Sequence, residues 1–223
     1  MTKRAISLCS LLLFVIPVVT LLICHQIVVY YYDFHTIPFI DGKASISQMG
    51  RGEKTIVIFR SGFFLYALVS IYFYFEISKF FLSKGFKNKL KALSISANLF
   101  LLIYLFALGK DQIFFEICRR LAIVFYIVNM YINHFYMIRI LRYLKFKKKI
   151  QLNIIYLIVF YTVIFLMTIL VIIGLPWVNP LFKYPTQLKN IVEWNYLFLT
   201  IIFYIPVSFM FYQFRKNVKS GHI

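Results

Sequence analysis

The sequence predicts an all-α polytopic membrane protein, a bundle of six transmembrane helices with a long first extracytoplasmic loop. Its apolar content is 62 %, well above the roughly 45–50 % of soluble domains, and its mean hydropathy is +0.82. Several apolar runs approach the about 20 residues that a helix needs to cross a ~30 Å hydrocarbon core. Because the connections are short, we expect residues 1–223 to form a single membrane domain.

Six apolar runs mark the expected helices. The first is too long for a signal peptide and lacks a small-residue cleavage pattern, so it is predicted to be an uncleaved span. Pro17 near its middle is expected to kink it, because proline removes a backbone hydrogen bond. Residues 175–185 contain three prolines and Trp177 and are expected to form an irregular interfacial loop. The expected helices cover approximately residues 5–30, 56–76, 92–108, 117–138, 152–174 and 191–211.

The distribution of charge predicts the orientation. Six spans place both termini on one side, and roughly two thirds of the 25 Lys and Arg residues fall on that side. Every acidic residue except Glu76 falls on the opposite side. Since Lys and Arg collect in cytoplasmic loops, both termini are expected in the cytoplasm. The abundance of Ile, Phe, Tyr and Lys suggests an AT-rich genome, and hence a plasma membrane of the bacterial inner-membrane type.

The net charge of +18 has the same explanation. In a soluble protein such a charge would suggest nucleic-acid binding, but here the positive-inside rule accounts for it, and no nucleic-acid partner is expected. The basic segment RILRYLKFKKK, residues 139–149, adjoins a span. Its position favours contact with anionic lipid at the cytoplasmic face.

The loop at residues 30–60 is the longest polar interruption in the first half of the chain. It leaves the bilayer through three tyrosines and carries Asp33, His35 and Asp41 before Arg60 opens the next span. One proline and three glycines punctuate it and several large apolar residues could anchor it, so we expect it to fold on the outer surface.

Other ionisable residues open spans on the same side. Glu116 and Arg119 or Arg120 have the spacing of an ordinary helical ion pair, whereas Arg60 and Glu193 each stand alone. Ionisable groups at membrane depth usually face a bundle interior or a wet cavity, although they can also reach the headgroups. A pairing of Arg60 with Glu193, direct or through a ligand, is therefore a hypothesis. The candidate ligand-binding residues are Asp33, His35, Asp41, Arg60, Glu116, Arg119, Glu193 and Trp194.

Catalytic, metal and cofactor motifs are not recognisable in the sequence. The serines lack a G-x-S-x-G context, and the histidines lack the spacing of a zinc or haem site. His134, beside Asn133 and near Asn129, is expected to make hydrogen bonds between helices. We therefore expect no metal or cofactor and assign no catalytic residue; an enzymatic version of the site would use one of the outer carboxylates as general base.

Short motifs resemble the DRAM/Frag/Sfk membrane family. These are Pro38-Phe39-Ile40 and Ser45-Ile46-Ser47 in the first loop, Phe59-Arg60 before the second span and Glu193-Trp194 before the last. The layout covers nearly the whole chain, but Phe115 to Leu121 lacks a His found in many members. Members of that family are linked to remodelling of GPI-anchor lipids, to autophagy and to phospholipid homeostasis, so the resemblance implies a role facing lipids.

The preferred function is recognition of a lipid headgroup by an extracytoplasmic pocket, in which Arg60 would neutralise phosphate and Asp33, Asp41 and Glu193 would hold hydroxyls or position Arg60. The alternatives are a small carrier, or a membrane subunit of a transport complex, and a subunit that serves only in assembly. The expected partners are membrane lipids, and the sequence identifies no protein partner.

Overall fold

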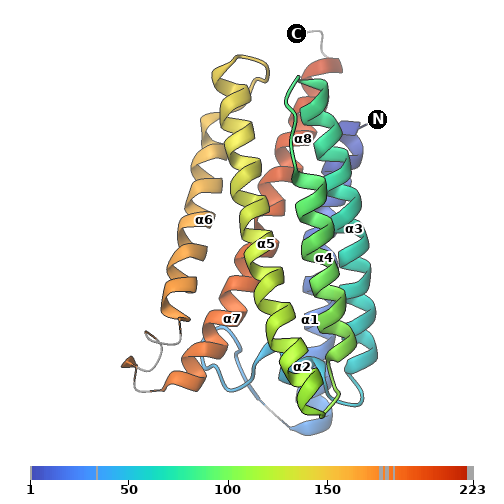
Figure 1. Cartoon of the computed structure of the whole chain (residues 1–223), viewed down its shortest axis with the longest axis vertical. Coiled ribbons are helices and arrows are strands. Elements are labelled where there is room, and N and C mark those ends of the chain that lie inside the picture. Colours follow the sequence, from blue (N-terminus) through green and yellow to red (C-terminus); the bar gives the residue numbers. More distant parts are fainter. Residues whose placement is uncertain (1, 34, 176–177, 179–180, 183, 220–223) are drawn as a thin grey trace.

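The computed structural model describes residues 2–33, 35–175, 178, 181–182 and 184–219, and these form helices and turns without a strand. The long helices run alternately up and down, so that α1 begins and α8 ends at the same end of the bundle (Figure 1). We call this end the terminal end. The opposite end, which carries the short helix α2, is called the α2 end.

The helices differ greatly in length. In the described part of the chain, five helical stretches are long and apolar enough to cross a membrane, which indicates an integral membrane protein. They are α1, α3, α4, α6 and the stretch formed by α7 with α8. The bounds are α1 Thr2–Tyr32, α2 Ile46–Gly50, α3 Ile56–Ser83, α4 Leu90–Ala107, α5 Ile113–Phe146, α6 Ile154–Ile173, α7 Pro185–Ile202 and α8 Tyr204–Lys219.

Helix α5 is the longest element and runs beside α4 along the bundle (Figure 1). Its 34 residues span about 51 Å at 1.5 Å per residue. Stacking of the Phe100 and Phe125 rings, 4.9 Å apart, is one contact between these helices. Helix α5 is not among the five stretches of the described chain that are long and apolar enough to cross a membrane.

Close contacts position α1 against its two neighbours, α3 and α8. A Cβ atom on Gly62 of α3 would lie 2.0 Å from the Thr20 hydroxyl, so only glycine allows α1 and α3 to approach so closely at this point. On the other side of α1, the Ser7 hydroxyl donates to the Ser208 carbonyl at 3.0 Å, and the Ser208 hydroxyl donates to the Ser7 carbonyl at 2.8 Å. These contacts hold α1 between α3 and α8.

The structure corrects the expected helix limits in two ways. Helices α3 and α5 extend seven to eight residues further toward the terminal end, to Ser83 and Phe146. The last expected helix, residues 191–211, consists of α7 and α8 with a break at Phe203. The cause is Pro206, which has no N–H to donate to the Ile202 carbonyl and whose ring crowds that carbonyl.

Other expected limits shift by only a few residues. The helix expected at 92–108 covers Leu90–Ala107, and the one expected at 152–174 covers Ile154–Ile173. Helix α1 extends to both sides of the expected 5–30 and continues through Pro17. Of the expected proline-rich loop, residues 176–177, 179–180 and 183 lie outside the described residues.

Candidate functional site

Residues 35–55, here called the α2 segment, lie between α1 and α3 and are fastened to the first turns of α7. The Asn190 side chain donates to the Gly42 carbonyl at 2.8 Å, and the buried Trp194 indole donates to the Ala44 carbonyl at 2.9 Å. Asn195 donates to the Phe39 carbonyl at 3.1 Å. Trp194, a candidate ligand-binding residue, therefore anchors the α2 segment.

Gly42 lies at the closest approach of the α2 segment to α7. Its φ of +60° falls in the left-handed region, where glycine is favoured. A Cβ atom here would lie 2.2 Å from the Gln187 carbonyl oxygen, which is backbone and cannot swing aside. The glycine thus allows the segment to dock.

The Asp41 carboxylate organises the turn that precedes Gly42. It accepts hydrogen bonds from the Thr36 hydroxyl at 2.6 Å, the Ile37 N–H at 2.8 Å and the Lys43 N–H at 3.1 Å. Partial burial tends to raise the pKa of Asp41, but these hydrogen bonds and the Lys43 ammonium outweigh it and hold the pKa below its ordinary value. Asp41 is therefore occupied by the fold of the segment.

Asp33 and His35 lie apart from these contacts. Both side chains are largely exposed, at 95 % and 76 %, and they contact each other at 3.2 Å. The structure does not bring either of them to Arg60 or Glu193 through any hydrogen bond or ion pair of the described residues.

Next to the α2 segment, an apolar cavity of about 340 Å³ lies between α1 and α7. The segment covers it, since Ile37, Pro38 and Phe39 line one side. Its most polar feature is His25, whose Nε2 lies 3.0 Å from the Thr36 carbonyl oxygen. None of the described residues that line the cavity is Lys, Arg, Asp or Glu.

Arg60 of α3 caps the carboxyl end of α4. Its Nε donates to the Leu105 carbonyl at 3.0 Å, and one terminal nitrogen donates to the Leu108 carbonyl. The last carbonyls of a helix have no partner within the helix and carry partial negative charge, so a cation is favoured here. The two hydrogen bonds use part of the five N–H donors of the guanidinium and fix its position.

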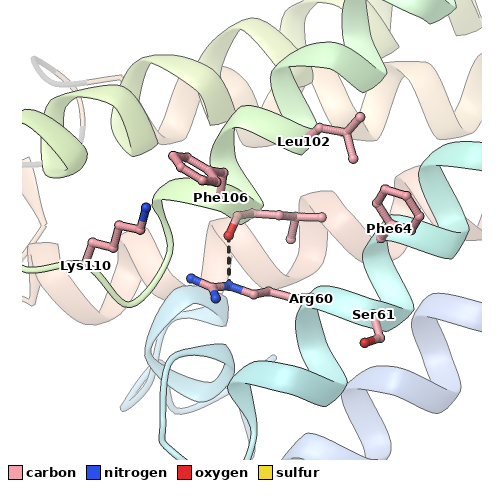
Figure 2. A pocket seen from close by; sticks show the side chains of 7 residues that line it. Arg60, Ser61, Phe64, Leu102, Phe106 and Lys110 are labelled. Atoms are coloured by element: carbon pink, nitrogen blue, oxygen red, sulfur yellow. Dashed lines mark hydrogen bonds between the residues drawn. The ribbon is translucent and has the colours of Figure 1, made fainter.

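A second cavity, open and about 560 Å³ in volume, begins at Arg60 and extends between α3 and α4. Figure 2 shows Ser61 and Phe64 on α3 opposite residues of α4, with Lys110 on the turn that follows. The Lys110 ammonium lies 3.5 Å from the centre of the Phe106 ring. Two cations and no acidic residue line this cavity; the lining residues are Arg60, Ser61, Phe64, Leu102, Leu105, Phe106 and Lys110.

The start of α5 is close to the same helix end but forms contacts of its own. Arg119 donates to the Ala107 carbonyl at 3.5 Å, so it also caps α4. Arg120 forms an i,i+4 ion pair with Glu116, as its spacing indicated, and both are solvent-accessible. Glu116 and Arg119 thus have structural contacts and do not line the cavity beside Arg60.

Glu193 faces the bundle interior. It lines a small cavity of about 50 Å³ together with Tyr104, Tyr126 and Tyr196. Arg60 lines the other cavity, and no ion pair joins Arg60 to Glu193 among the described residues. The described residues thus show no direct Arg60–Glu193 ion pair, and an interaction through a ligand stays a hypothesis.

Two sets of polar residues escaped the sequence analysis. Lys110 lies in a short turn whose charge looks like that of any exposed loop, and only the fold shows that it shares a cavity with Arg60. The second set is a group of buried tyrosines around His134, whose Nε2 lies 3.3 Å from the Tyr204 hydroxyl. The spacing of Tyr66, Ser70 and Tyr74, one helical turn apart in an apolar span, could have revealed part of it.

Comparison of the chain with family models, with curated proteins and with solved structures finds no match.

Proposed function

We propose that this integral membrane protein binds an anionic phospholipid in the cavity between α3 and α4. The observation that carries the proposal is the composition of this cavity, in which Arg60 and Lys110 adjoin a wall of apolar side chains. A phospholipid has the same order of chemistry, a phosphate followed by acyl chains. Because no acidic residue of the described chain lines the cavity, no negative charge there would repel an anion.

Each part of the lining has a role in this proposal. The guanidinium of Arg60 binds phosphate through two N–H groups in one plane, which the two carbonyl contacts on α4 hold in place. Lys110 adds a second positive charge. The acyl chains lie along Phe64, Leu102 and Phe106, whose apolar surfaces face hydrocarbon at little cost.

This proposal keeps the expected role of Arg60 and changes its partners. Asp41 serves the fold of the α2 segment, and Glu193 lies in another cavity. Lys110 and Ser61 line the cavity with Arg60, whereas the sequence-based hypothesis had the carboxylates there. The resemblance to the DRAM/Frag/Sfk family, whose members are linked to phospholipid homeostasis, points to the same class of ligand.

We place the bundle in a bacterial inner membrane, with the α2 end outside and the terminal end in the cytoplasm. In this arrangement α5 is a sixth span. The bias of Lys and Arg toward the terminal end supports this orientation. Arg139 and Arg142 line a further cavity at that end, with Tyr143, Phe146 and Tyr161, where anionic lipid of the inner leaflet would bind. An impermeant thiol reagent added outside should label Lys43→Cys and not Lys147→Cys, and the reverse pattern would contradict the orientation.

Arg60→Gln tests the lipid site. We expect phosphatidylglycerol to raise the melting temperature of the purified protein more than phosphatidylcholine does. A hydrogen bond to a charged group contributes about 1.5–3 kcal/mol, so Arg60→Gln should weaken binding of phosphatidylglycerol roughly ten- to hundredfold. Lys110→Gln should weaken it less and leaves the end of α4 capped.

Arg120→Gln is the matched control, because Arg120 is exposed at the same end of the bundle and pairs with Glu116. It should retain the stabilisation by phosphatidylglycerol. Equal stabilisation by both lipids in the unmodified protein, or equal losses in the Arg60 and Arg120 variants, would overturn the proposal.

One observation favours the alternative of a small carrier. Asn133 and His134 are fully buried near the middle of α5, where carriers place their binding sites. Uptake of a solute by vesicles containing the protein, unaffected by Arg60→Gln, would favour that function over lipid binding.

A further inference from the structure

A series of buried hydroxyl groups runs through the bundle interior, and it is independent of the lipid cavity. The Tyr126 hydroxyl of α5 donates to that of Tyr66 on α3 at 3.3 Å. The Tyr66 hydroxyl also lies beside that of Tyr204 on α8. Tyr204 is within 3.5 Å of the Tyr74 hydroxyl and 3.3 Å of the His134 Nε2. We call Tyr66, Ser70, Tyr74, Tyr126, His134 and Tyr204 the polar column; all six are at most 4 % exposed.

Toward the α2 end, the polar column reaches the small cavity that Glu193 lines. Tyr126 lines the same cavity, so Glu193 and the column border one space. Its volume of about 50 Å³ exceeds the roughly 30 Å³ that one water molecule occupies in the liquid. Among the described residues, the Glu193 carboxylate has no hydrogen bond to another side chain or to the backbone.

Among the described residues, several buried polar atoms have no hydrogen-bond partner in the protein. They are both amide atoms of Asn133, the Nδ1 of the adjacent His134 and, on α4, the Oδ1 of Asn98. Leaving such groups without a hydrogen bond is costly, and buried water molecules are the usual partners. Water beside Asn133 and His134 would extend the series of hydroxyl groups.

Toward the terminal end, polar residues continue on α3 and α4. Tyr66, Ser70 and Tyr74 follow one another at four-residue spacing, about 6 Å per step along one face of α3. The Asn98 amide donates to the Ser70 hydroxyl at 3.1 Å and to the Ser94 hydroxyl at 3.2 Å. Ser94 lies four residues from the first residue of α4, Leu90, so the polar groups approach the terminal end.

We propose that the polar column, with bound water, conducts protons through the bundle, with Glu193 as the proton-binding group at the α2 end. A proton binds to the Glu193 carboxylate. Each hydroxyl or water then accepts one proton from its neighbour and releases its own to the next, so that one proton leaves toward the terminal end for each that enters. No bond to carbon changes, and a counter-ion balances the charge.

The surroundings of Glu193 suit a group that takes up and releases a proton. Lys189, on the same helix, attracts the Glu193 carboxylate electrostatically. Arg51 and Arg119 exert a similar attraction on the hydroxyl of the neighbouring Tyr104. The hydroxyl-bearing residues Tyr126 and Tyr196 reach the same cavity from α5 and α7. In the part of the chain that the structure describes, no ion pair closer than 4 Å fixes Glu193 in its charged form.

Proton flux into liposomes tests the proposal. The purified protein is reconstituted with a pH-sensitive dye inside, and valinomycin with a potassium gradient sets the membrane potential. We expect flux above that of protein-free liposomes. Tyr66→Phe removes one hydroxyl and keeps the ring, and both it and Glu193→Gln should lower the flux at least about tenfold, as expected for the loss of one hydrogen-bonded link.

Tyr72→Phe is the matched control, since Tyr72 lies on α3 but is half exposed, and its flux should be unchanged. Arg120→Gln, which changes an exposed residue that pairs with Glu116 and lies outside the polar column, should also conduct normally. Melting temperatures of the variants show that each is folded. Flux equal to that of protein-free liposomes, or equal flux in the Tyr66 and Tyr72 variants, would overturn the proposal.

Discussion

The cavity between α1 and α7 and the cavity between α3 and α4 differ in the charge of their lining residues and in how open they are. The cavity between α1 and α7 is apolar, and the α2 segment lines one side of it. The cavity between α3 and α4 is open and contains Arg60 and Lys110. The polar side chains near the first cavity, Asn190 and Trp194, are used to hold the segment. The chemistry-bearing residues at this end of the bundle therefore divide into those that hold the α2 segment and those, Arg60 and Lys110, that line an open cavity.

Gly42→Ala should weaken the docking of the α2 segment on α7 more than the other substitutions do. The left-handed backbone costs an Ala about 1–2 kcal/mol, and the contact with the Gln187 carbonyl adds to this. We expect the α2 segment to detach and its amides to exchange rapidly with deuterium, measured by mass spectrometry. Stabilisation by phosphatidylglycerol should persist, because the α3–α4 cavity lies elsewhere.

Gly52→Ala controls for the loss of a glycine in the same segment. Gly52 does not have a positive φ, and its Cβ would meet only the Thr55 hydroxyl at 3.2 Å and the Tyr32 ring. Equal exchange in both variants would show that docking of Gly42 on α7 does not hold the segment.

Trp194→Phe should have an intermediate effect. It keeps an aromatic ring next to Phe39 but leaves the buried Ala44 carbonyl without its donor, which costs about 1–3 kcal/mol. We expect faster amide exchange in residues 36–44 and little change elsewhere. Phe198→Leu, which removes a ring contact with Phe39 and no hydrogen bond, should change exchange less; the opposite order would argue against the anchoring role of Trp194.

Asp41→Asn should have the smallest effect and one that depends on pH. Because the folded pKa of Asp41 lies below its ordinary value of about 3.9, its contribution is present above that value and is lost as the pH falls through the lower folded pKa. Protection of the Thr36 to Lys43 amides should therefore decline in acid for the unmodified protein. The Asn variant should be less protected at neutral pH and should not change across this acid range.

Much of the helical architecture follows from the sequence, because apolar runs of membrane length are visible in it. The limits were less accurate where helices pass into charged surface: hydropathy marks the thickness of hydrocarbon, whereas α3 and α5 stay helical to Ser83 and Phe146. The break at Phe203 follows from Pro206, but its consequence for the helix was not predicted.

The candidate site was less predictable, since it depends on the direction of each side chain. Glu193 and Trp194 are adjacent and seemed to mark one place, yet successive residues of a helix point about 100° apart. Trp194 therefore reaches the α2 segment, and Glu193 faces the interior. Arg60 was placed at the correct end of its helix, but its partners on α4 depend on how the two helices pack.

A phosphatidylglycerol with a photoreactive group on its acyl chain, cross-linked to the protein in membranes and mapped by mass spectrometry, tests lipid binding most directly. The two cavities predict different products. Cross-links should concentrate on Phe64, Leu102 and Phe106, and Arg60→Gln should reduce them, while a phosphatidylcholine probe should label these residues weakly. Cross-links concentrated on the α1–α7 cavity, or spread evenly around the bundle with no effect of Arg60→Gln, would contradict the account.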